Sequence, residues 1–170
     1  MGSGKSTIGP ILANTLGFEF FDIDRMIERE AGKRVVEIFS EESEASFRQR
    51  ERRALDAVFA LEHCVVSLGG GTIANQENLQ LIRSHGLLVY LALSPEEILH
   101  RVQHRTDRPL LKGASGENLP RGEMEHRIRE LLSLRAPFYE QADVVIAADQ
   151  QRVGLTVDQI VKRLRQLTHV

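Results

Sequence analysis

The stretch MGSGKST at residues 1–7 decides the fold of this chain. It matches the second half of the pattern G-x-x-x-x-G-K-[ST], in which a glycine-rich loop leads directly into a helix. Glycines let backbone N–H groups approach phosphate oxygens without a Cβ in the way, and the N-terminus of a helix attracts anions. The competing interpretation is a glycine-rich tail that happens to precede a helix.

A helix expected at residues 6–16 and strands of the parallel type beyond it favour a phosphate-binding loop of the Walker A kind. In such loops the lysine reaches the β- and γ-phosphates of ATP, and the next hydroxyl ligates the Mg²⁺ that bridges them. Lys5 and Ser6 occupy these positions, so we expect ATP as phosphoryl donor and Mg²⁺ as cofactor. The residues expected to hold the nucleotide phosphates are Gly2, Ser3, Gly4, Lys5, Ser6 and Thr7.

The leading glycine of the pattern, and the strand that should feed the loop, are absent from this sequence. That strand belongs in the middle of the sheet, and each buried backbone group left without a partner costs about 1 to 3 kcal/mol. We therefore expect Met1 to be an internal methionine of the natural chain, with about ten further residues upstream, enough for a strand and the start of the loop.

The order of apolar and helical segments predicts one α/β domain over residues 1–170. Four apolar runs do not alternate with polar residues, which is typical of a parallel sheet covered on both faces. These runs lie at residues 18–21, 64–68, 87–93 and 144–148. Helices are expected at residues 6–16, 24–31, 43–61, 76–84, from 95 onward, at 123–136 and at 156–167. The expected fold is a doubly wound parallel sheet with helices on both faces.

Composition narrows the classes of partner. The chain has 170 residues, 42% of them hydrophobic and 27% charged, with a net charge of -2. This balance gives no global basic field for nucleic acid or anionic lipid, and no apolar run approaches a membrane span. A single cysteine, Cys64, excludes an intrachain disulfide and fits a reducing cytoplasm. We expect a cytoplasmic monomer that acts on small molecules.

Residues 105–122, RTDRPLLKGASGENLPRG, break the pattern of strands and helices. The segment mixes basic residues with three glycines and two prolines. A solvated surface loop and a mobile lid that closes over phosphates are both consistent with this composition. The phosphate-binding loop favours the lid, because an arginine on a closing loop can neutralise charge on the transferring phosphoryl group.

Two acidic residues follow the first apolar run. Asp22 and Asp24 stand at the carboxyl end of the expected strand, the edge of an α/β sheet where ligands bind. One carboxylate there can organise hydrated Mg²⁺, and the other can hold and deprotonate a hydroxyl nucleophile. The alternative for Asp24 is a helix N-cap.

Several further motifs resemble those of shikimate kinases, in the family's order. They are FDID at residues 21–24, EASFRQRE at 44–51, LGGG at 68–71, RTDRPLL at 105–111 and LRAPFY at 134–139. The chain departs from the family pattern at Ser43, where the family usually has glycine. Apart from the missing start, the resemblance covers the whole chain. It implies the strand order 2-3-1-4-5, which nucleoside monophosphate kinases share, with the first strand absent here.

The resemblance also implies a role for each matching residue. It assigns Asp22 to the water shell of the metal and Asp24 to the acceptor hydroxyl. Arg48 and Arg135 would hold the acceptor carboxylate, for which the planar guanidinium is well shaped. Gly69, Gly70 and Gly71 would present backbone to the acceptor hydroxyls. On the nucleotide side, Arg108 would neutralise the transferring group, Arg105 would cover the adenine face, and Arg152 would approach the adenine edge.

The expected reaction is transfer of the γ-phosphoryl group of ATP to shikimate, driven by positioning and electrostatics. A related kinase acting on gluconate or a nucleoside monophosphate would share the phosphate loop but need other acceptor residues. A nucleotide-binding module without acceptor chemistry is the alternative from another class. ATP turnover that ignores added shikimate would distinguish that module from a kinase.

Overall fold

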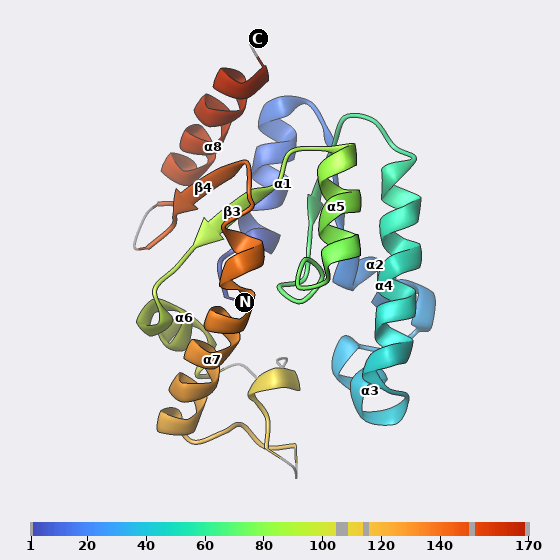
Figure 1. Cartoon of the computed structure of the whole chain (residues 1–170), viewed down its shortest axis with the longest axis vertical. Coiled ribbons are helices and arrows are strands. Elements are labelled where there is room, and N and C mark those ends of the chain that lie inside the picture. Colours follow the sequence, from blue (N-terminus) through green and yellow to red (C-terminus); the bar gives the residue numbers. More distant parts are fainter. Residues whose placement is uncertain (1, 105–108, 114–115, 150–151, 169–170) are drawn as a thin grey trace.

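The computed structural model describes residues 2–104, 109–113, 116–149 and 152–168 (Figure 1). Along the chain the elements are α1 (Lys5–Leu16), β1 (Glu19–Asp22), α2 (Ile23–Ala31), α3 (Val35–Glu41), α4 (Glu44–Phe59), β2 (Cys64–Ser67), α5 (Gln76–His85), β3 (Val89–Ala92), α6 (Pro95–Val102), the 3₁₀ turn η1 (Pro109–Leu111), α7 (Arg121–Tyr139), β4 (Val144–Ala147) and α8 (Val153–Thr168). The α/β class predicted from the sequence is confirmed.

The four strands form two parallel pairs. β1 pairs with β2, in the register Glu19 opposite Cys64, and β3 pairs with β4, in the register Val89 opposite Val144. Within the described part of the chain, the strand hydrogen bonds do not join one pair to the other. In the expected order 2-3-1-4-5 the first strand is absent from this chain, so β1 and β2 correspond to strands 2 and 3, and β3 and β4 to strands 4 and 5. Both observed pairings are compatible with that order. The rest of the order stays a prediction.

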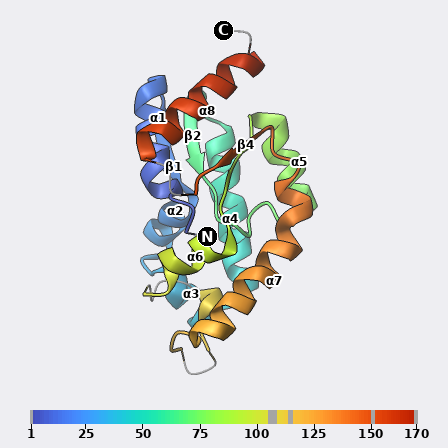
Figure 2. The same cartoon turned by 90° about the vertical axis from the view of Figure 1, so that its left-hand side faces the viewer.

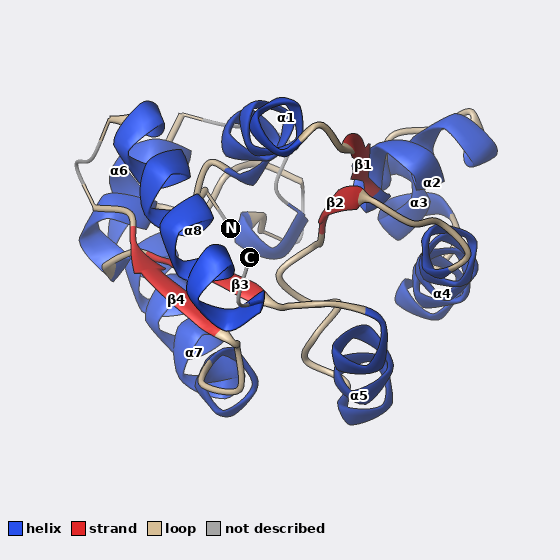
Figure 3. Ribbon diagram, turned by 90° about the horizontal axis from the view of Figure 1, so that it is seen from above, coloured by secondary structure: helices blue, strands red, loops and turns tan. Residues whose placement is uncertain are grey.

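Helices cover both faces of the strands (Figure 3). α1 lies against β1 and β2 and also packs along α8, which in turn covers β4. α4, α5 and α7 lie on the opposite side. Figure 2 shows α6 and α7 together below the strands, where the two helices pack on each other. This is the doubly wound arrangement that near-continuous apolar strands predict.

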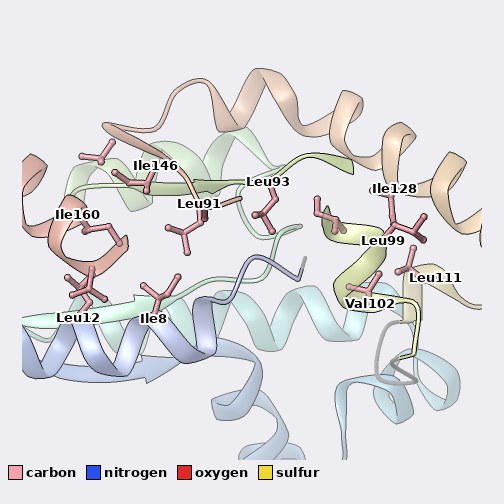
Figure 4. Packing of buried hydrophobic residues seen from close by; sticks show 14 of the residues in the cluster. Ile8, Leu12, Leu91, Leu93, Leu99, Val102, Leu111, Ile128, Ile146 and Ile160 are labelled. Carbon is pink, nitrogen blue, oxygen red and sulfur yellow. The ribbon is translucent and has the colours of Figure 1, made fainter. Parts of the chain in front are cut away.

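The core has two hydrophobic clusters. The first surrounds β3 and β4 and joins them to the helices α1, α6, α7 and α8 (Figure 4). The second surrounds β1 and β2 and joins them to α2, α4 and α5. Both strand pairs are therefore packed against a hydrophobic core, which supports the loops that follow the strands.

Local chemistry explains where the first helices begin and end. α1 ends at Gly17 and α2 ends at Gly32, both with positive φ, the conformation that favours glycine after a helix. The Asp22 carboxylate caps α2 by accepting from the Arg25 amide, whereas Asp24 lies inside its first turn. Gly9 lets α1 approach β1, because a Cβ there would lie 2.3 Å from a Phe20 ring carbon.

Three expectations from the sequence need correction. α3 and η1 were not predicted, and α7 does not stop at Ala136 but continues through Pro137 to Tyr139. Pro137 is exposed, so water can reach the carbonyl that loses its helical partner. Leu111 lies in the segment that the sequence predicts to be a surface loop or a lid, but it is 2% exposed and packs in the first cluster (Figure 4). Among the described helices, none is long and apolar enough to cross a membrane.

Candidate active site

The phosphate-binding loop has the backbone that its glycines predict. Gly2 and Gly4 have φ of 64° and 84°, the left-handed region that other residues rarely adopt. The Gly4 carbonyl accepts from the amides of Thr7 and Ile8 and so starts α1. Gly4 has no side chain to cap the helix, which leaves the approach to its N-terminus open to an anion. Ser3, within the loop, is buried.

Ser6 and Asp22 meet at the end of β1. The Ser6 hydroxyl donates to Asp22 Oδ2 at 3.1 Å, although the two residues are 16 positions apart. A hydroxyl and a carboxylate are both hard oxygen donors of the kind that Mg²⁺ prefers. The pair predicted from the sequence to serve the metal is therefore brought together, and its chemistry fits Mg²⁺. The described segments contain no group of three or more acidic, histidine or cysteine side chains that could hold a metal ion.

Arg101 of α6 is a contact of the phosphate loop that the sequence did not predict. Its guanidinium donates to the carbonyls of Gly2 at 3.4 Å and Ala148 at 3.3 Å, and to Glu97 at 2.7 Å. The side chain is 29% exposed. It therefore ties the start of the phosphate loop to the segment after β4 and places a positive charge beside the phosphate loop.

The triple-glycine loop after β2 lies against side chains that the sequence predicts to bind the acceptor. A Cβ at Gly69 would lie 3.4 Å from Asp24 Oδ1 and 3.6 Å from Glu51 Oε1. A Cβ at Gly71 would lie 2.8 Å from Arg48 Nη2. Because these side chains pack directly on glycine backbone, larger residues in the loop would displace them. The structure thus brings Asp24, Arg48 and the three glycines to one place at the carboxyl ends of β1 and β2.

Arg48 of α4 is held by carboxylates on its own helix. Its Nη1 donates to Glu51 and its Nη2 to Glu44, both at 2.9 Å. Burial opposes the charge on Arg48, but the bonds to Glu51 and Glu44 outweigh it and raise the pKa of the guanidinium above its ordinary value. Its guanidinium carbon also lies 5.4 Å from the Phe47 ring centre. The side chain is 34% exposed, so an anion from solvent can reach it.

Two buried residues behind Arg48 were missed by sequence reasoning. Glu51 is 1% exposed and Thr72 is 0% exposed. Thr72 Oγ1 donates to Glu51 Oε1 at 2.7 Å, and the other Glu51 oxygen accepts from Arg48. Glu51 lies in a helix rich in charged residues, and nothing in its immediate sequence marks it as buried. Its burial could be foreseen only from the apolar stripe of α4, which includes Phe47 and Leu55.

Tyr139 ties α7 to the triple-glycine loop. Its hydroxyl donates to the Gly70 carbonyl at 3.2 Å, and its ring stacks on Tyr90 of β3. Arg135 lies one turn earlier on α7, and residues four apart share a helix face. Arg135 is half-buried, and this spacing puts it on the side of α7 that meets the loop.

The remaining predicted nucleotide contacts are less defined. Arg105 and Arg108 lie outside the described residues, as does part of the segment expected to be a lid. Arg152 is described and exposed, just before α8, where its carbonyl accepts from the Thr156 amide. Lys5 is half-buried at the first position of α1, as the motif requires.

The fold and this site define a class of protein. A glycine loop at a helix N-terminus, a hydroxyl–carboxylate pair for Mg²⁺, and an adjacent cluster with an acid and an arginine describe a P-loop phosphotransferase with a small acidic acceptor. Comparison with known proteins narrows the class. The family model described as "Shikimate kinase" matches residues 1–165. The chain belongs to the shikimate kinase family, and it is an ATP-dependent kinase.

Individual relatives agree with the family match. The shikimate kinase of Chlorobaculum tepidum is 52% identical over 97% of this chain and 86% of its own length. That of Chlorobaculum parvum is 50% identical over 97% of this chain and 88% of its own length. The solved shikimate kinase of Acinetobacter baumannii in complex with shikimate has a TM-score of 0.88 and 33% identity, covering 98% of this chain and 89% of that one.

Proposed function

We propose that this chain transfers the γ-phosphoryl group of ATP to the 3-hydroxyl of shikimate, giving shikimate 3-phosphate and ADP. The observation that carries the proposal is the convergence of Asp24, Arg48 and the triple-glycine loop on one another, beside the Ser6–Asp22 pair. The reaction would serve aromatic amino acid biosynthesis in the cytoplasm. The family membership and the shikimate complex of the Acinetobacter relative support the acceptor.

The acceptor is held by its carboxylate and its hydroxyls. Arg48 is half-exposed beside Gly71, and Arg135 is on the face of α7 that also bears Tyr139. Two guanidinium groups suit a carboxylate, because their planar N–H groups match its two oxygens. The backbone of Gly70 then faces the ring hydroxyls, with the loop held in place by Tyr139.

In this proposal Asp24 acts on the reacting hydroxyl. It accepts the proton of the 3-hydroxyl while that oxygen forms a bond to the γ-phosphorus. The bond between the γ-phosphorus and the oxygen that links it to the β-phosphate breaks, and ADP leaves with that electron pair. Lys5 and the amides at the start of α1 stabilise the charge on the phosphates. Ser6 and Asp22 would hold Mg²⁺, which supplies neutralising charge between the β- and γ-phosphates when bound.

A comparison of acceptors tests this proposal. ADP formation by the purified chain with ATP and Mg²⁺ would be measured with shikimate, shikimate methyl ester, gluconate and AMP. We expect shikimate to give the highest kcat/KM, and the ester to lose most of it because Arg48 and Arg135 have no carboxylate to bind. Equal kcat/KM values for shikimate and its methyl ester would contradict the proposed binding of the carboxylate by Arg48 and Arg135. A preference for gluconate or AMP would reassign the acceptor.

A further inference from the structure

Among the described residues, the proposed mechanism leaves one buried charged side chain, Glu51, without a role. Glu51 is 1% exposed, and burying a carboxylate costs free energy unless hydrogen bonds satisfy it. Each of its oxygens has one donor: Thr72 Oγ1 for Oε1, at 2.7 Å, and Arg48 Nη1 for Oε2, at 2.9 Å. The same carboxylate therefore connects the interior of the triple-glycine loop to the residue proposed to bind the acceptor.

Thr72 is fixed at three of its atoms. Its amide donates to the Gly69 carbonyl at 3.1 Å, and its carbonyl accepts from Asn78 Nδ2 of α5 at 3.1 Å. Its hydroxyl donates to Glu51, and the residue is 0% exposed. The two backbone bonds hold the main chain of Thr72 in place, and the bond to Glu51 sets the direction of its hydroxyl. The loop that faces the acceptor hydroxyls thus also determines which Glu51 oxygen is free for Arg48.

The occupied oxygen limits how Arg48 can bind Glu51. A guanidinium beside an unhindered carboxylate prefers two parallel bonds, one to each oxygen. With Oε1 taken by Thr72, Arg48 makes a single bond from Nη1 to Oε2, and Nη2 is directed to Glu44 at the exposed end. An acceptor carboxylate can replace an exposed partner such as Glu44 at little cost. It could not replace a buried two-point pair with Glu51.

We propose that Thr72 is a positioning residue for the acceptor: its hydroxyl occupies Glu51 Oε1 and thereby keeps the outer N–H groups of Arg48 available to the acceptor carboxylate. The inference rests on the proposed function. Thr72 touches neither substrate in this account, so its loss acts on the binding of shikimate and not on the binding of ATP.

The test is a set of Thr72 variants with kinetics for both substrates. Thr72→Val keeps the shape but removes the donor, so Arg48 can bind both oxygens of Glu51. We expect the KM for shikimate to rise at least about tenfold, the effect of losing one hydrogen bond between Arg48 and the acceptor carboxylate. The KM for ATP should change less than about twofold. The preference for shikimate over its methyl ester should fall, which loss of stability alone would not produce. Ile160→Val, a change in the other core cluster, serves as the stability control.

A second pair covers the case in which Thr72→Val does not fold. Thr72→Ser and Thr72→Ala both lose the methyl group, but only serine keeps the donor. Serine should retain the KM for shikimate, and alanine should raise it. Two results would show that the inference is wrong, provided that the parent chain phosphorylates shikimate. One is that the serine and alanine variants have the same KM for shikimate. The other is that a variant raises the KM for ATP as much as the KM for shikimate. If the parent chain ignores shikimate, the proposed function itself fails, which is a distinguishable result.

Discussion

Gly71→Ala is the substitution whose effect the structure specifies most closely. A Cβ at this position would lie 2.8 Å from Arg48 Nη2, 3.2 Å from Nη1 and 3.4 Å from Cζ. All three atoms belong to the guanidinium group. Non-bonded heavy atoms rest about 3.5 Å apart, so the group must move by roughly 0.7 Å. The φ of Gly71 lies outside the left-handed region, so alanine itself fits the backbone.

The expected magnitude follows from which atoms must move. The end of an arginine side chain can shift without disturbing the core, so the free energy of unfolding should change by less than about 1 kcal/mol. The displaced guanidinium weakens its bond to the acceptor carboxylate, and bonds to charged groups contribute about 1.5 to 3 kcal/mol. We therefore expect the KM for shikimate to rise by about 10- to 100-fold. The KM for ATP should stay within about twofold.

The assay is coupled ADP release at varied shikimate and varied ATP, together with thermal unfolding of each variant. Gly86→Ala is the matched control, because a Cβ there has no atom within 4 Å and Gly86 lies after α5, outside the predicted site, so it should leave both KM values unchanged. Gly9→Ala is the opposite control, since its Cβ would lie 2.3 Å from the Phe20 ring and should lower stability. An unchanged KM for shikimate in a folded Gly71→Ala variant would refute the placement of Arg48 in the acceptor site.

Four further predictions follow from the same structure. Arg48→Lys should raise the KM for shikimate about tenfold or more, because an ammonium cannot bind two oxygens in parallel. The control Arg52→Lys changes an exposed ion pair with Asp56 and should leave this KM unchanged. Equal effects of the two substitutions would contradict the binding of the acceptor carboxylate by Arg48. Asp24→Asn should lower kcat by about 10² to 10⁴-fold with ATP binding, measured by calorimetry, nearly intact; a residual kcat above about a tenth would remove its role as base. Leu111→Ala should cost about 2 to 5 kcal/mol in denaturant unfolding, and a loss below about 1 kcal/mol would contradict its burial. Burial raises the pKa of the Cys64 thiol, with a contribution from Glu19, so its reaction with a disulfide reagent should be slow at neutral pH and accelerate as pH rises; a fast reaction at neutral pH would contradict this.

Much of the fold could be read from the sequence because its signals are local. Gly17 and Gly32 mark helix ends by their own conformation, and the apolar runs mark strands to within a residue or two. α3 was missed for two reasons. It has only seven residues, and its N-cap is Arg34 instead of the usual serine or aspartate, with the Arg34 amide donating to the Glu37 carboxylate. Pro137 suggested that α7 ends at Ala136. A helix can continue through a proline whose side of the helix is exposed to water, and that exposure is set by the tertiary structure, which the local sequence does not reveal.

In the candidate site, too, the residues in local motifs could be predicted and those that depend on tertiary contacts could not. Lys5, Ser6 and Asp22 belong to short motifs, and Ser6 and Asp22, each predicted separately to serve the metal, lie in contact. Arg101 could not be identified, because its contact with Gly2 spans 99 positions of sequence. Thr72 meets Glu51 over 21 positions. Glu51 also looks like its neighbours in a helix rich in charge, and only packing distinguishes the one that is buried.

The central claim is that this chain phosphorylates one particular hydroxyl of shikimate. ³¹P NMR of a reaction containing the purified chain, ATP, Mg²⁺ and shikimate tests it directly, since the phosphorus of a phosphate ester couples to the proton on the carbon that bears it. We predict one new monoester signal, coupled to the proton on C3, that grows as the γ-phosphate signal of ATP declines. Inorganic phosphate in place of an ester, or an ester on another hydroxyl, would contradict the account.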